Sequence, residues 1–474
     1  MTARLSPDDI LAQLRAILGD AHVLTSAGDQ AGYLREWRDR YDGKALAVVR
    51  PGSTYDVSRI LSYANDHGIG VVPQGGNTGL VGGQIPSTRG DQIVLSLSRM
   101  RTVRAVDTDG GAMIVEAGVT LREAQFAAEN TGRLFPLSLA SEGSAQIGGV
   151  LATNAGGTAV LAYGNARNLC LGLEVVLADG RVWNGLRTLK KDNTGYDLRD
   201  LMIGSEGTLG VITAAALKLL PRPRDVAAAI VALPTPGDAL KLFRLAEDRV
   251  GPSLTAFEFW SRRAMDFALA YMPNTRDPLG GLSQWYALIE ISNGDDRGSA
   301  SEQLETLLAD ALRDGLVSDA AVSASEQQRL EFWHLRESFS EAQKGAGGSI
   351  KHDISVPIAR IPEFLTRAAT IVECICPGAR PVPFGHFGDG NLHYNVSQPE
   401  GMDKSRYLAL WDAMSDAVHT LVADMNGSIS AEHGIGQMKR AALVAHKSTV
   451  EIDIMRAIKA ALDPEGILNP GKLL

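Results

Sequence analysis

The chain has 474 residues, of which 45% are hydrophobic and 21% are charged, and its formal net charge is −9 at pH 7. This length is too great for one compact core and predicts two or three domains. The acidic balance argues against a nucleic-acid partner, whose phosphates require a basic surface, and no apolar run approaches the ~18–20 residues that span a bilayer.

The N-terminal residues predict the start of a folded helix. Ser6 is an N-cap, Pro7 occupies the first helical position and Asp9 completes a capping box. This pattern differs from a targeting peptide, which has a basic region followed by an apolar core. The chain has three cysteines, Cys170, Cys374 and Cys376. An odd, small number of cysteines does not build a disulfide framework. We therefore expect a reducing compartment and a cytoplasmic location.

Short β-branched runs alternate with helical segments from about residue 45 to residue 220, which predicts an α+β segment. The predicted elements are the strands Ala47–Val49, Val71–Val72, Ile93–Leu97 and Met113–Glu116, and a helix over Val57–His67. Pro221-Arg222-Pro223-Arg224 then breaks the pattern and marks the first domain boundary.

The second region opens with an apolar strand, Ala227–Leu233, and continues with longer helical patterns. The predicted helices cover Ser301–Arg313, Gln327–Lys344, Tyr407–Asp424 and Val450–Leu462. The chain ends in a turn-rich tail that contains Asn469-Pro470-Gly471-Lys472.

Glycine is abundant, with 50 residues, and much of it lies in three clusters. The first, Gly75–Gly83, follows an apolar strand, and glycines there let backbone N–H groups converge on a phosphate. The G-x-G-x-x-G spacing and the P-loop are both missing, so a simple tight turn is an equal alternative. The second and third clusters, Ser141–Gly164 and Ile203–Ile212, suggest backbone packed against a large flat ligand, although loops and helix contacts alone would give the same spacing.

These three clusters, in this order, resemble the FAD domain of the vanillyl-alcohol oxidase flavoprotein superfamily, and the resemblance extends to Asn469–Lys472. It implies a two-subdomain FAD-binding domain over residues 1–222. It also implies an α+β substrate-binding domain with an antiparallel sheet over 223–425, and a segment, 426–474, that returns to the FAD domain. Some members attach FAD through a histidine in the first loop. Gly76-Asn77-Thr78 holds no histidine, so we expect non-covalent FAD.

The FAD contacts that the resemblance implies come from all three clusters and from the tail. They are Pro73, Gly75, Gly76, Asn77, Thr78, Gly79, Leu80, Gly82, Ser144, Gly148, Gly149, Asn154, Gly157, Gly164, Glu206, Gly207, Gly210, Ile212 and Asn469.

The segment Phe384–Asn395 contains two histidines around a strong two-residue hairpin signal, Asp389-Gly390. A turn there pairs residue 386 with residue 393, so His386 and His393 would face each other with Cβ atoms ~4.5–5.5 Å apart. Strand alternation places Asn395 on the same side, opposite Phe384. Two facing imidazoles suit a transition metal, although a cross-strand histidine pair is by itself more often only a surface feature.

A third ligand is available in Ala431-Glu432-His433-Gly434. Two histidines and one glutamate occur in catalytic zinc sites and also in non-haem iron sites, so ligand type leaves the metal open. His386, His393 and Glu432 are similar to the metal ligands of the D-2-hydroxyglutarate and D-lactate dehydrogenase branch of the superfamily. The resemblance implies a divalent metal, for which we expect Zn²⁺, with His433 as the catalytic base and a substrate contact, and Asn395 as a second substrate contact. Glu432 and His433 can face one point only if the chain bends, as Gly434 would allow.

The helical segment Trp333–Ser340 places Arg336 and Ser340 on one face, and Lys351 follows in a strand-like run, Ser349–Pro357. Taken alone, Arg336 or Lys351 would be interpreted as a solvated charge on the surface. Together they would bind a carboxylate, and dehydrogenases specific for D-2-hydroxyglutarate have Arg, Thr and Lys in these positions. Here Ser340 retains the hydroxyl group, and Lys351 favours a dicarboxylate, because relatives specific for D-lactate generally lack the lysine.

The sequence therefore predicts an FAD- and metal-dependent dehydrogenase that oxidises D-2-hydroxyglutarate to 2-oxoglutarate by hydride transfer to flavin N5. D-malate and D-lactate are alternative substrates, because one methylene changes binding by only ~1–3 kcal/mol. A flavin-binding electron-relay subunit without its own substrate is the alternative from another class. The missing dinucleotide fingerprint disfavours an NAD enzyme, and a zinc hydrolase would leave the glycine clusters unexplained. Electron-transfer flavoprotein or a quinone is the expected electron acceptor, and a homodimer is expected by analogy.

Overall fold

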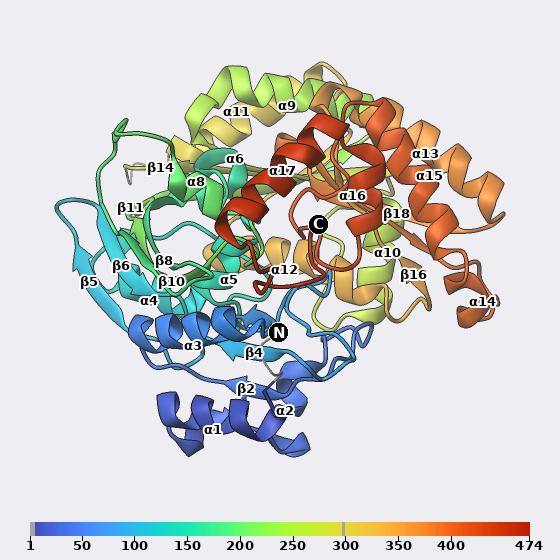
Figure 1. The fold of residues 1–474 in the computed structure, drawn as a ribbon. Helices are drawn as coiled ribbons and strands as arrows, with labels where there is room; N and C mark the ends of the chain where they lie inside the picture. The colour runs from blue at the N-terminus through green and yellow to red at the C-terminus, as the bar shows by residue number, and fades with distance from the viewer. Residues whose placement is uncertain (1–4, 296–298) are drawn as a thin grey trace. The chain divides into compact units, whose positions relative to one another are not determined.

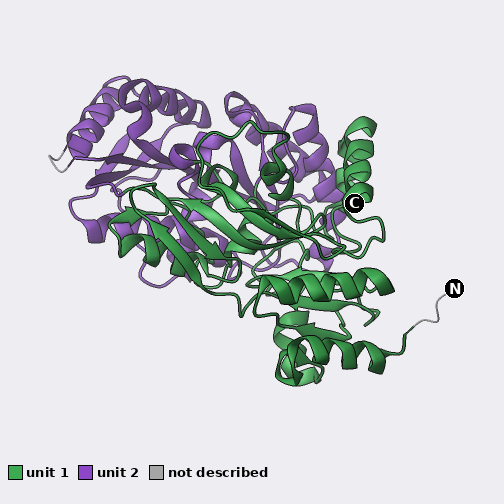
Figure 2. Cartoon of the chain, turned by 60° about the vertical axis from the view of Figure 1, so that its left-hand side comes forward, with its two compact units in different colours: residues 1–157, 164–221, 432–474 green, residues 158–163, 222–431 purple. Residues whose placement is uncertain are grey.

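The computed structural model describes residues 5–295 and 299–474 and divides the chain into two compact units (Figures 1 and 2). The first unit comprises residues 1–157, 164–221 and 432–474, and the second comprises residues 158–163 and 222–431. The chain leaves the first unit within the predicted linker, between Pro221 and Arg222, and re-enters it between Ala431 and Glu432. The C-terminal segment of the chain thus belongs to the same unit as the first and third glycine clusters and most of the second, of which only residues 158–163 lie in the other unit.

The first unit contains a four-stranded sheet in the order β1-β2-β4-β3, in which β4 pairs in parallel with β2 and β3. Its strands are β1 (Val23–Leu24), β2 (Ala47–Val49), β3 (Val71–Gln74) and β4 (Ile93–Ser96). Its helices are α1 (Pro7–Leu18), α2 (Ala27–Leu34) and α3 (Thr54–His67), with a 3₁₀ turn η1 at Asp20–His22. Ser6 and Asp9 form the predicted capping box at the start of α1.

A five-stranded antiparallel sheet in the order β5-β6-β10-β8-β9 forms the other part of this unit. Its strands are β5 (Val103–Asp107), β6 (Ala112–Glu116), β8 (Cys170–Val176), β9 (Val182–Gly185) and β10 (Val211–Lys218). The remaining elements are α4 (Leu121–Glu129), β7 (Arg133–Leu134), α5 (Ile147–Ala152), α7 (Ala166–Leu169), α8 (Leu198–Met202), β11 (Leu220–Pro221), α16 (Arg440–His446) and α17 (Thr449–Leu462). Helix α3 connects the two sheets, since Thr54 Oγ1 donates to Glu174 Oε1 on β8 at 2.6 Å.

The second unit is built on an eight-stranded antiparallel sheet in the order β15-β12-β14-β13-β18-β19-β16, with β17 also paired to β19. Its strands are β12 (Asp225–Leu233), β13 (Leu254–Ser261), β14 (Trp285–Asn293), β15 (Asp319–Val322), β16 (Ser349–Ile350), β17 (Asp353–Ser355), β18 (Arg380–His386) and β19 (Asn391–Ser397). Its helices are α6 (Val160–Tyr163), α9 (Pro236–Val250), α10 (Arg262–Tyr271), α11 (Ser299–Arg313), α12 (Glu326–Ala342), α13 (Ile361–Ile375), α14 (Lys404–Leu408) and α15 (Trp411–Asp424), with 3₁₀ turns η2 (Gly251–Ser253), η3 (Ile358–Arg360) and η4 (Phe387–Asp389).

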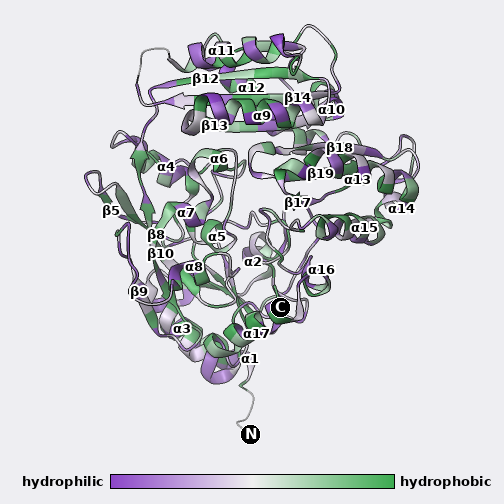
Figure 3. Ribbon diagram, turned by 90° about the horizontal axis from the view of Figure 1, so that it is seen from above, coloured by the Kyte–Doolittle hydropathy of each residue, from purple (hydrophilic) through white to green (hydrophobic). Residues whose placement is uncertain are grey.

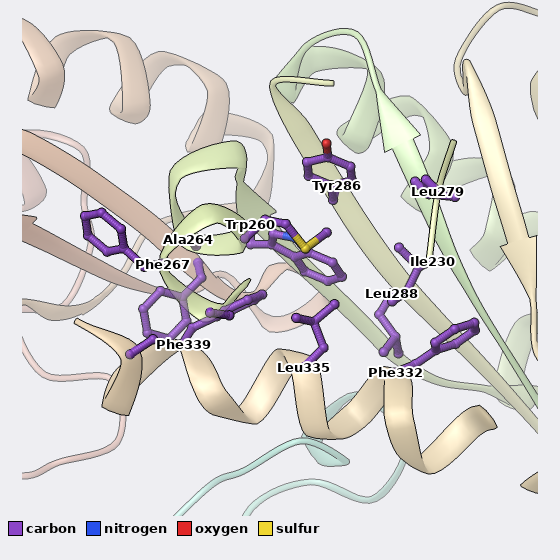
Figure 4. Close-up of a cluster of buried hydrophobic side chains, with 14 of the residues drawn as sticks. Ile230, Trp260, Ala264, Phe267, Leu279, Tyr286, Leu288, Phe332, Leu335 and Phe339 are labelled. Carbon is purple, nitrogen blue, oxygen red and sulfur yellow. The ribbon is translucent and has the colours of Figure 1, made fainter. Parts of the chain in front are cut away.

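Aromatic side chains fill the space between α12 and the sheet. Trp260 of β13 stacks on Tyr286 of β14 and meets Phe339 of α12 with ring centroids 5.3 Å apart (Figure 4). In Figure 3 the sheet strands are largely hydrophobic, whereas α11 alternates between hydrophilic and hydrophobic residues. The amphipathic pattern of these helices explains their position, because one face packs on the sheet and the other faces water.

The structure corrects two predicted elements. The single helix predicted over Tyr407–Asp424 is two helices: α14, which Asp403 caps at its start by accepting from the Arg406 amide, and α15, which begins at Trp411 after a turn at residues 409 and 410. The strand-like run Ser349–Pro357 is likewise interrupted between β16 and β17. Residue periodicity alone predicts neither of these interruptions.

Candidate active site

Predicted site residues of the second unit gather on one face of its sheet, the face that α12 covers. The register pairs Glu258 with His386 and Trp260 with Phe384, and pairs Phe384 in turn with His393. Residues that pair across antiparallel strands point to the same side. The histidines therefore share the face on which Trp260 packs against α12.

The predicted hairpin register is wrong by two residues. His386 pairs with Asn391 instead of His393, because the connection is a four-residue loop and not a two-residue turn. The loop consists of η4 followed by Gly390 at φ 85°, and Asp389 Oδ1 accepts from the Asn391 amide at 2.9 Å. Only Gly390 of the predicted turn pair has a positive φ, whereas a two-residue hairpin turn of type I′ needs two such residues.

A shift of two residues preserves the side of the sheet on which each residue lies, so the predicted histidine face survives the correction. The imidazole rings of His386 and His393 lie with centroids 5.8 Å apart in an edge-to-face arrangement. Asn395 is on the same face, opposite Val382 rather than Phe384, and is 3% exposed.

Glu258 holds His386 in position. His386 Nδ1 lies 2.7 Å from Glu258 Oε1, and the carboxylate is only 1% exposed. Burial by itself would raise the pKa of Glu258, but the Arg336 guanidinium and His386 together hold that pKa below its usual value. An ionised acceptor at Nδ1 favours the tautomer with its proton there, and in that tautomer the lone pair of His386 lies on Nε2, the atom through which such a histidine binds a metal.

His393 lies beside a second buried carboxylate. Asp353 of β17 pairs with His393 in the ladder, and its Oδ1 lies 3.8 Å from His393 Nδ1. The same oxygen accepts a hydrogen bond from Asn391 Nδ2 at 3.0 Å. Each of the two imidazoles thus has a carboxylate next to its Nδ1 atom, which is the arrangement that metal-binding histidines usually have.

The predicted carboxylate-binding residues also come together. Arg336 and Ser340 lie one turn apart on α12, and Lys351 Nζ donates to the Ser340 carbonyl oxygen at 3.2 Å and to its Oγ at 3.4 Å. Arg336 Nε donates to Glu258 Oε2 at 2.7 Å, so this arginine joins the histidine face. The four predicted substrate contacts Arg336, Ser340, Lys351 and Asn395 all belong to the second unit.

Sequence reasoning missed Glu258 and Asp353. A signal for Glu258 exists, because it is the one acid in an apolar run, Leu254–Ser261, and an isolated acid in such a run is rarely buried without a partner. Its partners were not predictable from local sequence, because His386 lies 128 residues away along the chain.

In the first unit, the three glycine clusters converge at the end of β3. A Cβ atom added to Gly76 would lie 1.8 Å from the Ser144 carbonyl oxygen, so only glycine lets the first cluster approach the second this closely. A Cβ atom on Gly207 of the third cluster would lie 3.1 Å from Pro73 Cγ. This close approach fits a cradle of backbone groups around a flat cofactor with phosphates.

Polar side chains fix the loops of this cradle. Asn77, at φ 55°, donates from Nδ2 to the carbonyl oxygens of Gly32 and Arg35 at 3.0 Å each. Asn469 Nδ2 donates to the carbonyl oxygens of Gly83 and Glu206 at 3.0 and 2.8 Å, so the C-terminal tail connects the first cluster to the third. All predicted FAD contacts therefore belong to one unit.

The same unit holds Glu432 and His433. Glu432 Oε1 accepts from the Gly157 amide at 3.1 Å, and the backbone bends from residue 431 to 433 before Gly434 at φ 80°. Glu206 Oε1 and Oε2 accept from the amides of residues 435 and 436 at 2.8 and 2.7 Å. The bend that the Glu432-His433 pair requires is thus present, and Glu206 anchors it.

No helix in residues 5–295 and 299–474 is long and apolar enough to cross a membrane.

Comparison with known proteins gives two family matches. The family described as "FAD binding domain" matches residues 45–185, and the family described as "FAD linked oxidases, C-terminal domain" matches residues 222–473. A protein named probable D-2-hydroxyglutarate dehydrogenase, mitochondrial, from Oryza sativa subsp. japonica is 38% identical over 99% of this chain and 82% of its own length.

A yeast protein and a solved structure are also similar to this chain. The D-2-hydroxyglutarate–pyruvate transhydrogenase of Saccharomyces cerevisiae is 36% identical over 98% of this chain and 94% of its own length. The crystal structure of p-cresol methylhydroxylase with substrate bound superposes with a TM-score of 0.77 at 17% identity, covering 98% of this chain and 96% of that one. The α+β fold with an FAD-binding domain of the vanillyl-alcohol oxidase type, predicted from the glycine clusters, is confirmed.

Proposed function

Because this chain belongs to the FAD-linked oxidase family, together with the D-2-hydroxyglutarate dehydrogenases, we propose that it oxidises D-2-hydroxyglutarate to 2-oxoglutarate. The observation that carries the proposal is the contact of Lys351 with Ser340, one helical turn from Arg336. Two cationic groups on the histidine face match the two carboxylates of this substrate. D-lactate, with one carboxylate, would leave one of them without a ligand.

We propose that His386, His393 and Glu432 hold a divalent metal, Zn²⁺. The arrangement of His386 supports this, because Glu258 accepts at Nδ1 and favours the tautomer whose lone pair lies on Nε2. Glu432 directly follows Ala431, whose amide lies 3.4 Å from the carbonyl oxygen of Asp353. When bound, the metal supplies a Lewis acid that lowers the pKa of the substrate hydroxyl, and FAD supplies a hydride acceptor at N5.

Side chains of this protein carry out substrate binding and proton transfer. Arg336 and Lys351 bind carboxylates, and Asn395 contributes a buried amide that can donate to the substrate. His433 takes the proton from the substrate hydroxyl as the hydride leaves C2. Since Glu206 anchors the bend after His433, the base is held on a backbone of defined conformation.

The test is anaerobic bleaching of the flavin by a panel of hydroxy acids, with and without a chelator. We expect D-2-hydroxyglutarate to bleach it fastest, D-malate and D-lactate more slowly and the L-enantiomers not at all, and we expect chelation to slow bleaching. Preference for D-lactate would overturn the substrate, and bleaching unaffected by complete metal removal would overturn the metal. A protein that retains FAD but is bleached by none of these acids would instead be an electron-relay subunit.

The electron acceptor is tested in the same preparation. We propose electron-transfer flavoprotein, with a quinone analogue as the second candidate, and the name of the yeast relative adds pyruvate as a third. Each is added to the reduced enzyme under anaerobic conditions, and the acceptor is the one that restores the oxidised flavin spectrum within the turnover time. Sedimentation of the same sample tests the proposed homodimer.

A further inference from the structure

Glu258 is a buried acid that connects two parts of the site. It lies on β13 between two buried phenylalanines, Phe257 and Phe259, and is 1% exposed. A charge in such surroundings is retained only when it is paired and hydrogen-bonded. Both of its carboxylate oxygens are in fact engaged, and each by a different residue.

The first oxygen binds a histidine and the second binds an arginine. Oε1 lies 2.7 Å from His386 Nδ1. Oε2 accepts from Arg336 Nε at 2.7 Å, and Arg336 Nη2 lies 2.6 Å from the same oxygen. His386 comes from the neighbouring strand β18 and Arg336 from helix α12, so one carboxylate joins three elements.

We propose that Glu258 is a positioning residue that orients the metal-binding face of His386 and the carboxylate-binding edge of Arg336 together. The proposal rests on the proposed function, since it takes His386 as a metal ligand and Arg336 as a substrate contact. Its own content is that one carboxylate sets both geometries, so that metal affinity and substrate affinity change together when it is altered.

For His386, the acceptor at Nδ1 decides which nitrogen carries the proton. With a carboxylate there, the neutral imidazole is protonated at Nδ1 and presents its lone pair at Nε2. Replacing the carboxylate with an amide makes the opposite arrangement available. An amide N–H that donates to Nδ1 leaves the proton on Nε2, and that tautomer cannot bind a metal through Nε2.

For Arg336, the carboxylate occupies the Nε edge and leaves the end of the guanidinium for a ligand. The guanidinium also lies over the Phe384 ring, with Cζ 5.2 Å from its centroid. Nη2 makes no hydrogen bond of good geometry although it is buried. Because a guanidinium carries five N–H donors in a fixed fork, Nη1 and the outer hydrogen of Nη2 remain for bidentate binding of a carboxylate.

The chain offers a matched control in the Glu290–Arg329 pair. Glu290 lies on the adjacent strand β14, and its Oε2 accepts from Arg329 Nη1 and Trp333 Nε1 at 2.7 Å each. Arg329 precedes Arg336 by two turns of the same helix. Glu290 and Arg329 therefore form an ion pair between the sheet and α12, as Glu258 and Arg336 do, but with a tryptophan as the further partner where Glu258 has a histidine.

The test compares Glu258→Gln with Glu290→Gln in the FAD-loaded protein. Zn²⁺ affinity is measured by competition with a chromophoric chelator, and KM and kcat for D-2-hydroxyglutarate are measured with a dye as acceptor. We expect Glu258→Gln to bind Zn²⁺ about 10–100-fold more weakly, as loss of an outer partner of a ligating histidine does, and to raise KM by about tenfold or more. Glu290→Gln should leave both quantities within about twofold of the native values.

A folded Glu258→Gln protein with native Zn²⁺ affinity and native KM would overturn the proposal, and so would a loss confined to kcat. Should that variant fail to fold, Glu258→Asp is measured, because its shorter carboxylate keeps the charge but cannot span both partners. Native values in both assays for Glu258→Asp would equally overturn it. The proposed function is tested on the native protein alone, since it fails if that protein binds no Zn²⁺ and is not bleached, whatever the variants do.

Discussion

Replacing Lys351 with methionine should change which hydroxy acid the enzyme prefers. The ammonium group contacts the carbonyl oxygen and hydroxyl of Ser340 at 3.2 and 3.4 Å, which holds it against α12, the helix that we propose binds the substrate carboxylates. A hydrogen bond between charged groups contributes ~2 kcal/mol, which corresponds to about 30-fold in an equilibrium or rate constant. We therefore expect kcat/KM for D-2-hydroxyglutarate to fall about 30-fold, and kcat/KM for D-lactate to change by less than about threefold.

The assay is steady-state dye reduction with both substrates on the same preparation. Lys344→Met is the matched control, because Lys344 lies just beyond the same helix and pairs with Glu341 at a side-chain exposure of 54%. We expect this variant to change kcat/KM for neither substrate. An equal fall for both substrates would show that Lys351 supports the fold or the common carboxylate. An unchanged preference would refute its assignment to the second carboxylate.

Three further predictions concern the first unit. His433→Asn should slow anaerobic flavin reduction about 10²–10⁴-fold with little change in substrate affinity, and stopped-flow bleaching at the native rate would contradict the role of His433 as the base. Glu206→Gln leaves only one oxygen to accept from the two backbone amides of residues 435 and 436. This should destabilise the unit by ~1–3 kcal/mol and lower its Tm by about 2–10 °C. An unchanged Tm would show that this anchor is dispensable. Burial alone would raise the pKa of Glu174, but hydrogen bonds from Thr54, Arg104 and Thr213 outweigh it and hold that pKa below its ordinary value of 4.5. Its ionised form therefore stabilises the fold above about pH 4.5, and this stabilisation is lost as the pH falls through the folded-state pKa. Glu174→Gln should therefore lower the urea midpoint at pH 7, and the loss should shrink as the pH is lowered step by step below about 4.5. A loss of the same size at every pH would contradict this.

Local chemistry explains why many elements could be predicted from the sequence. The strand Ala47–Val49 and the helix over Val57–His67 carry their own signals, in β-branched residues and in the Gly68 that ends α3 at φ 63°. The glycine clusters predicted a cofactor-binding domain for a similar reason, because two backbone segments can approach closely only at residues without a side chain. Strand alternation also determined which residue types share one face of the sheet, and helical spacing determined which share one face of α12.

Only the tertiary structure decided how these parts meet. The hairpin register depended on Asp389 accepting a backbone amide, a choice between turns that differ little in sequence signal. Glu258 acquired its partners through strand pairing and helix packing, over separations of 78 and 128 residues. Such contacts depend on which surfaces pack together, and no local propensity specifies them. The sequence by itself thus determined the chemistry that is available, and the fold determined which of those groups act together.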